Sequence, residues 1–215
     1  MWGDNKDQQQ FGSVWPLWHG DAATQRRQEA VKLLRQLAER GYAPAQFALA
    51  MAYFDGQGVR RDYTKAFEMF LVAANQNYPA AEGMVGSFYA MVKPKQDACP
   101  HDPEQAAIWY QRGAEHGNLS AMINLASCFK SGLGVEANPA EVYVWASLAA
   151  QLSPIRSRPA EVLRDQAVTE LNGEQLKDLD RRISEMKSSL LHPWSEPHTY
   201  WKSLWQSTGN SADKS

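Results

Sequence analysis

The sequence predicts an all-α solenoid of about four helix pairs with a capping segment at each end, and three observations support this prediction. A pattern of small and aromatic residues starts at Gly41 and returns at Asn77 and Gly117, with spacings of 36 and 40 residues. Fixed-period similarity in this range is typical of stacked repeats. Within each unit the apolar residues recur at helical spacing, and turn residues separate the helices. One hairpin of this kind cannot bury its own apolar face, so neighbouring hairpins must stack.

Composition and charge exclude several classes of protein. The 215 residues are 44% hydrophobic, which excludes disorder of the whole chain. The net charge is -2 with interspersed signs, so we expect no nucleic-acid partner. The longest apolar stretch, residues 43–54, is far shorter than the ~20 residues that span a bilayer, so we expect no membrane insertion. The first ten residues lack the features of a signal peptide, which predicts a cytoplasmic protein, or a periplasmic one if a signal was removed.

Residues 1–20 are rich in aromatic residues but have neither helical nor alternating spacing, so we expect an extended arm that covers the first helices. Asp21 suits a helix N-cap, and apolar residues follow at helical spacing up to Gly41. Glycine takes the left-handed conformation after a helix without strain and asparagine takes it next most easily. We therefore expect Gly41, Asn77 and Gly117 to end three equivalent helices.

The second helix of the first pair is predicted to start at Pro44, where a missing N–H costs nothing. We expect Tyr53, Tyr89 and Phe129 to fill the wedges between successive pairs. The turn Asp55–Val59 returns as Ser131–Val135. The caps that open the following helices are Asp62 and Asn138.

In the second repeat a longer loop, residues 91–100, replaces this turn, and Asp102 restarts the helix. A loop that departs from a regular scaffold often carries binding residues. After residues 154–159 we expect a helix at about 160–171 and a further helix from Asn172 to Leu190. The predicted division is therefore an arm at 1–20, a solenoid at 21–190 with repeats at about 30–65, 66–105, 106–141 and 142–190, and an aromatic segment with a polar tail at 191–215.

Residues 22–190 resemble the Sel-1-like repeat family, which is related to tetratricopeptide repeats. The resemblance depends on Ala45, Leu49, Tyr53 and the turn Gly56–Val59, and the pattern returns at Gly132–Val135. It implies a right-handed α/α superhelix and an adaptor role, and it offers no catalytic residue. It also implies that the first helix of each pair, as counted here, lines a concave groove. Some short bacterial members resemble immunity proteins that block phospholipase effectors of type VI secretion.

Partner-binding residues are predicted in three places. The first helices align at Ala30, Ala66, Ala106 and Val142, and the residues five and nine positions after each of these face the groove under this assignment. The longer loop and the C-terminal aromatic stripe supply the rest. The groove positions are Arg35, Leu71, Gln111, Ser147, Glu39, Asn75, Glu115 and Gln151. The loop residues are Lys93, Lys95 and His101, and the aromatic residues are Tyr200, Trp201 and Trp205.

No residue pattern indicates a catalytic, cofactor or metal site. The Gly56-x-Gly58 pair follows a helix and lacks the third glycine of a phosphate-binding loop, so we interpret it as a turn. Cys99 and His101 lie near Asp102, but further ligands or a converging base are missing. For Cys99 and Cys128, two free thiols and a disulfide both remain open.

The sequence thus predicts a non-catalytic scaffold that binds a protein partner, with a monomer favoured. The alternative is an immunity protein that neutralises a phospholipase-like toxin, with the loop or the Trp201 segment as its plug. An enzyme is disfavoured, because no nucleophile, base and orienting group converge in the sequence.

Overall fold

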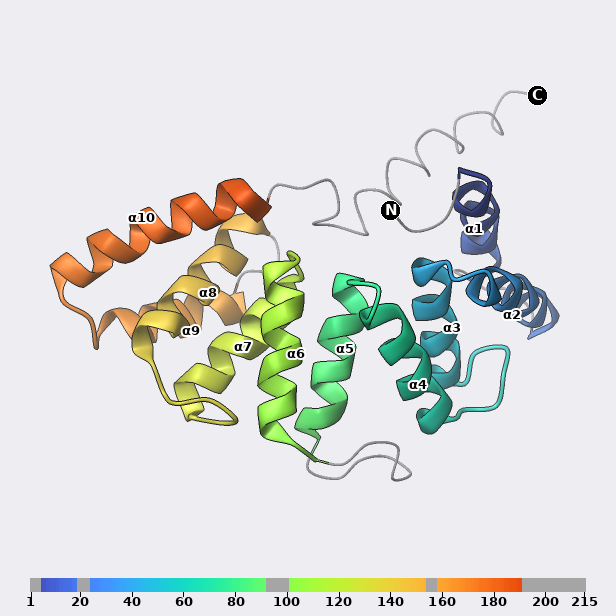
Figure 1. Ribbon diagram of the computed structural model, residues 1–215, viewed down its shortest axis with the longest axis horizontal. Helices are drawn as coiled ribbons and strands as arrows, with labels where there is room; N and C mark the ends of the chain where they lie inside the picture. Colours follow the sequence, from blue (N-terminus) through green and yellow to red (C-terminus); the bar gives the residue numbers. More distant parts are fainter. Residues whose placement is uncertain (1–4, 19–23, 92–100, 154–157, 191–215) are drawn as a thin grey trace.

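The computed structural model describes residues 5–18, 24–91, 101–153 and 158–190. Within these ranges the chain forms ten helices and no strand, which confirms the predicted all-α solenoid (Figure 1). The helices are α1 (Asn5–Trp18), α2 (Thr24–Glu39), α3 (Ala43–Asp55), α4 (Tyr63–Ala74), α5 (Pro79–Ala90), α6 (Pro103–Glu115), α7 (Leu119–Ser131), α8 (Pro139–Leu152), α9 (Arg158–Val168) and α10 (Gly173–Leu190). From α1 to α9 each helix packs against the next one in the chain.

The core runs along the stack as three adjoining clusters of buried side chains. Tyr53 packs against the first and second clusters, and Tyr89 packs against the second and third. These two rings therefore occupy the wedges between successive helix pairs, as the repeat pattern predicts. Continuous burial across neighbouring pairs is what stabilises a solenoid whose hairpins are too small to be stable alone.

The turn residues have the backbone geometry that their spacing predicts. Gly41, Asn77 and Gly117 have φ angles of 85°, 59° and 86°, which is the left-handed region. Gly134 also has a positive φ, and a Cβ built there would lie 2.0 Å from the carbonyl oxygen of Pro103. Only glycine fits this close approach between backbones.

The predicted helix caps are confirmed where the structure describes them. The side chains of Asp62 and Asp102 each accept a hydrogen bond of 3.0 Å, from the backbone N–H groups of Lys65 and Gln105. Asn138 and Asn172 cap α8 and α10 in the same way. Asp21 lies outside the described residues.

The prediction of an extended N-terminal arm is wrong for residues 5–18, which form helix α1. α1 packs on α2, where Phe11 and Val14 join the first core cluster. Asp7 pairs with Arg40 at 3.0 Å. The helix thus occupies the side of α2 on which a preceding repeat would lie.

The helices form two rows, with odd-numbered helices in one and even-numbered helices in the other. α5 contacts α7, and α7 contacts α9, whereas no comparable contact joins α2 to α4, α4 to α6 or α6 to α8 in the described residues. In a curved stack the helices of the inner row lie closest together. We therefore take the odd-numbered helices as the inner row, and the groove role that the sequence assigned to α2, α4, α6 and α8 stays a prediction.

The last helix departs from this order. An even-numbered helix normally packs on the odd-numbered helix before it, as α4 packs on α3 and α6 on α5. α10 instead makes its main contacts with α8, beside which it lies at one end of the stack (Figure 1).

Candidate partner-binding surfaces

The predicted groove positions form an exposed stripe along the outer row. Arg35, Glu39, Asn75, Gln111 and Glu115 are exposed, and Leu71 is half-buried. On α8 the pattern changes, because Ser147 is buried while Gln151 is exposed. We call these eight positions the outer stripe, together with the residue three before each of Arg35, Leu71, Gln111 and Ser147, namely Lys32, Glu68, Ile108 and Val144. The stripe is accessible on α2, α4 and α6.

The other predicted site residues are only partly described. His101 is exposed just before α6. Lys93, Lys95, Cys99, Tyr200, Trp201 and Trp205 lie outside the described residues, so their roles stay predictions. Cys128 is buried, and burial raises the pKa of its thiol, which is typical of an inert structural cysteine. Its pairing with Cys99 stays untested.

The inner row has a different chemistry from the outer stripe. Its partly exposed positions on α3 and α5 carry no charge and include Met51, Met84 and Ser87. Methionine is unbranched and flexible, and it adapts to differently shaped partners. Sequence reasoning missed this surface because it placed the groove on the other row of helices.

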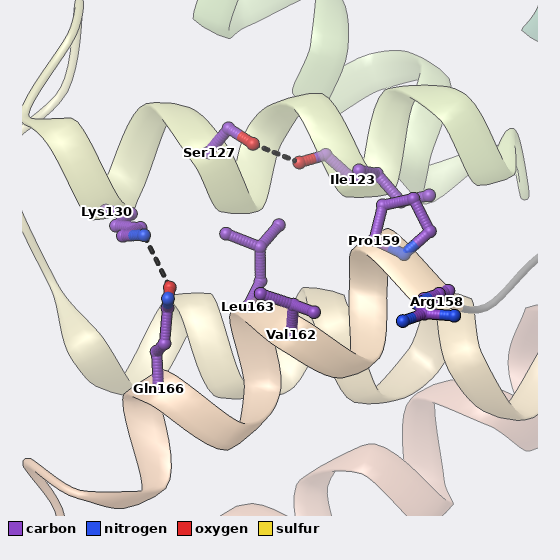
Figure 2. A pocket seen from close by; sticks show the side chains of 8 residues that line it. All are labelled: Ile123, Ser127, Lys130, Arg158, Pro159, Val162, Leu163 and Gln166. Atoms are coloured by element: carbon purple, nitrogen blue, oxygen red, sulfur yellow. Dashed lines mark hydrogen bonds between the residues drawn. The ribbon is translucent and has the colours of Figure 1, made fainter.

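A groove opens on the inner row between α7 and α9. Figure 2 shows Leu163 pointing from α9 toward α7, with Val162 beside it. Lys130 Nζ donates to Gln166 Oε1 at one end of the groove, and Arg158 lies at the other. Val162 is 50% exposed, and the two charged side chains of the lining are both cations. The lining consists of Ile123, Ser127, Lys130, Arg158, Pro159, Val162, Leu163 and Gln166.

The sequence alone did not predict this groove. α9 departs from the repeat pattern, so no register related its residues to those of α7. The available signal was weak: Val162 and Leu163 are adjacent apolar residues between Glu161 and Arg164 in a short helix.

A buried carboxylate joins α5 to α6. Glu82 is fully buried, and its Oε2 lies 2.7 Å from Nδ1 of His116. Arg112 Nε lies 3.4 Å from Oε1, and the Arg112 guanidinium also stacks over the ring of Trp109. Burial is the main cause that raises the pKa of Glu82, while His116 and Arg112 act in the opposite direction. These contacts all lie within the stack, so we assign this cluster to structure rather than to catalysis.

Neither a metal site nor a membrane helix is found in the described ranges. No group of three or more His, Cys, Asp or Glu side chains there could hold a metal ion. None of the helices in the same ranges combines the length and apolar character that a membrane crossing needs.

Comparison with protein families identifies the repeat. The family model of the Sel1 repeat matches residues 17–42, 43–78, 84–118 and 119–154. The chain belongs to the Sel1 repeat family. Proteins of this family generally act by binding other proteins, and the repeat is a non-catalytic interaction fold. Each matched unit from residue 43 on begins one helix later than the predicted repeats, so that α3 and α4 form one Sel1 unit.

Two curated relatives are similar over part of the chain. The chitin synthase regulator SKT5 of Malassezia restricta is 27% identical over 80% of this chain and 12% of its own length. The exopolysaccharide production negative regulator of Rhizobium leguminosarum bv. viciae is 28% identical over 55% of this chain and 48% of its own. The chain thus spans less than half the length of these relatives.

Solved structures show the same fold. A Sel1 repeat protein from Oxalobacter formigenes matches with a TM-score of 0.54 and 26% identity, over 61% of this chain and 95% of that protein. The protective antigen c5321 of uropathogenic Escherichia coli, which displays an SLR fold, matches with a TM-score of 0.53 and 20% identity, over 97% of this chain and 50% of the antigen.

Proposed function

We propose that this chain is a non-catalytic scaffold that binds a segment of a protein partner in the groove between α7 and α9. The observation that carries the proposal is the exposed apolar floor of this groove on the inner row, with Val162 half exposed to solvent. Apolar side chains grouped in a hollow are typical of interaction sites, since isolated proteins seldom leave such groups in water. Lys130 and Arg158 favour a partner segment with carboxylates beside its apolar anchor.

The family and the relatives support a binding role. Sel1 repeats generally mediate protein interactions, and the two relatives described above carry names of regulators. A preformed groove on a rigid stack needs little ordering on contact, which favours affinity. The partner is defined by its chemistry, as a protein segment with an apolar anchor and neighbouring carboxylates.

The proposal is tested by affinity capture with the tagged full chain in lysate of the source organism. Val162→Glu places a charge in the groove floor, whereas Val168→Glu places the same charge on α9 at a residue outside the groove lining. We expect the first variant to lose the proteins that the wild-type chain captures and the second to keep them. Equal capture by both variants would contradict the groove as the binding site.

The same experiment separates a scaffold from the immunity alternative. An inhibitor of a toxin captures one partner in stoichiometric amount, while a scaffold captures several partners with weaker retention. A single toxin-like protein whose activity falls on addition of this chain would favour the immunity function.

A further inference from the structure

The outer stripe is covered on one helix and open on the equivalent helix before it. α6 packs between α5 and α7, and α8 packs between α7 and α9, but α8 has α10 as an additional neighbour. Val144 on α8 is 0% exposed, whereas Ile108 at the same repeat position on α6 is 51% exposed. Ser147 is buried and its equivalent Gln111 is exposed. Val144 lies in the same buried cluster as Ile183 and Leu190 of α10, so we attribute this difference in burial to the additional helix.

α10 shows which chemistry the stripe of α8 accepts. Its apolar side chains Ile183 and Leu190 are buried in the same core cluster as the residues of α8. Beside them, Arg182 donates from both terminal nitrogens to the carboxylate of Glu141. Lys187 Nζ donates to Gln151 Oε1 at 3.2 Å. α8 is therefore covered by an amphipathic helix whose cations flank its apolar side.

The outer surface of α6 carries carboxylates at two positions where α8 has none, whereas Glu141 of α8 corresponds to Gln105 of α6. Glu115 occupies the position of Gln151, and Glu104 occupies the position of Ala140 one turn before Ile108. Glu68 on α4 adds a third exposed carboxylate at the position equivalent to Ile108. Glu115 accepts one hydrogen bond, from Gln111 Nε2 at 2.9 Å, and its carboxylate has room for further donors.

We propose that the outer stripe of α6, with the neighbouring stripe of α4, binds an amphipathic helix of a partner protein that carries lysine or arginine beside its apolar residues. The partner helix covers Ile108 as α10 covers Val144. It places cations toward Glu104 and Glu115 as α10 places Lys187 toward Gln151. This surface lies on the outer row, so the proposal goes beyond the groove and is independent of it.

Charge on this surface selects the partner, and apolar contact supplies most of the affinity. Exposed ion pairs contribute little individually, about 0.2–1 kcal/mol each, so two or three of them act together with burial of Ile108. The arrangement disfavours acidic helices, since three like charges would face them. α2 differs, because its stripe carries Lys32 and Arg35. We therefore limit the proposed site to α4 and α6.

The proposal is tested by NMR titration of the full chain with isoleucine methyl labels. The probe is a synthetic helical peptide of about 18 residues with a leucine stripe flanked by lysines, and the matched probe has glutamate in place of lysine. Ile108 lies in the proposed site, Ile123 in the α7/α9 groove and Ile183 on α10. We expect saturable shifts of the Ile108 methyl with the lysine peptide and none with the glutamate peptide.

Variants sharpen the test. We expect the double variant E104K/E115K to bind the lysine peptide at least about tenfold more weakly, and to keep its fold because both residues are exposed. E136K, an exposed change in the turn after α7, should bind the lysine peptide like the wild-type chain.

Three results would overturn the proposal. The first is equal binding of the lysine peptide by the double variant and the wild-type chain. The second is a shift of Ile123 without Ile108, which would place the helix in the groove instead. The third is a shift of Ile183 with loss of α10 packing, which would mean that the peptide displaces α10 from α8. The second result would favour the α7/α9 groove of the proposed function, and the first and third do not bear on capture through Val162, so the two proposals can fail separately.

Discussion

The α3/α4 pair and the α5/α6 pair carry different hydrogen-bonding side chains at two equivalent repeat positions. Gln46 on α3 accepts a hydrogen bond of 2.7 Å from Gln76 at the end of α4, and it donates to the carbonyl of Ala38. The equivalent residues of the next pair are Glu82 and His116, a carboxylate and an imidazole whose Oε2 and Nδ1 lie 2.7 Å apart. The same framework of small residues and turns thus accepts either kind of pair, provided that both partners change together.

Removing one partner of the Glu82–His116 contact should cost more free energy of unfolding than removing one partner of the Gln46–Gln76 contact. His116→Ala leaves the buried Glu82 carboxylate with Arg112 as its remaining cation, at 3.4 Å. We expect a loss of about 2 kcal/mol in the free energy of unfolding at pH 7, below the usual cost of breaking a buried ion pair because His116 is partly exposed. Gln76→Ala removes a neutral hydrogen bond and should cost about 1 kcal/mol. Urea denaturation measures both, and equal losses would contradict the contrast.

Packing also distinguishes the two pairs. Ala50 on α3 becomes Gly86 on α5, and a Cβ built on Gly86 would lie 2.6 Å from Cδ1 of the buried Tyr110 ring. Gly86→Ala gains helix propensity, but the overpacking it causes costs more, so we expect a net loss of about 1 kcal/mol. Ala50→Gly, which lowers propensity without new contacts, is the matched change at the other junction. A stability gain in Gly86→Ala, again by urea denaturation, would show that the ring can move aside.

The sequence predicted those features of the fold that depend on local geometry. Gly41, Asn77 and Gly117 are recognisable because few residue types take a left-handed φ, and Asp62 and Asn138 because few side chains cap a helix. Helix α1 was missed for the opposite reason. It contains Gly12 and Pro16 and has weak apolar periodicity, so its local helix propensity is low. The helix is stabilised instead by packing on α2, where Phe11 and Val14 are buried.

The candidate surfaces were less predictable than the fold, because they depend on how the helices are arranged in space. Repeat register correctly identified equivalent positions, but it could not tell which row of helices lies inside the curve. The burial of Glu82 was also hidden, since a glutamate at helical spacing is normally solvated. α10 follows the pattern of a helix that ends an array, and nothing in its residues specified that it packs on α8.

The carboxylate of Glu82 gives the α5/α6 junction a pH dependence that the α3/α4 junction lacks. Its pKa lies above its ordinary value of 4.5, mainly because of burial, so between these two values the folded chain binds more protons than the unfolded chain. Its contribution to stability is present below about pH 4.5 and is lost as the pH rises through the folded-state pKa. Arg112 and His116 oppose this shift, and Glu115 adds to it.

Glu82→Gln removes this titration while it leaves Arg112, His116 and Glu115 in place. We therefore expect the stability of the wild-type chain, relative to the variant, to fall between pH 4.5 and pH 7. Urea denaturation of both proteins across this range measures the difference. A constant difference would mean that the neighbouring cations fully offset the burial of Glu82, and a rising difference would mean that they outweigh it.

The smallest expected effect comes from converting one junction into the other. The double variant E82Q/H116Q installs at the α5/α6 junction the glutamine pair that joins α3 to α4, with the same repeat positions and the same hydrogen-bond geometry available. The net change in the free energy of unfolding at pH 7 should stay within about 1 kcal/mol, because a buried charge and its partner are lost together. The coupling energy between the two substitutions, measured as a double-mutant cycle with E82Q and H116Q, should be favourable. Additive losses would show that the two repeats differ in backbone position, and that glutamine pairing at Gln46 and Gln76 is not transferable.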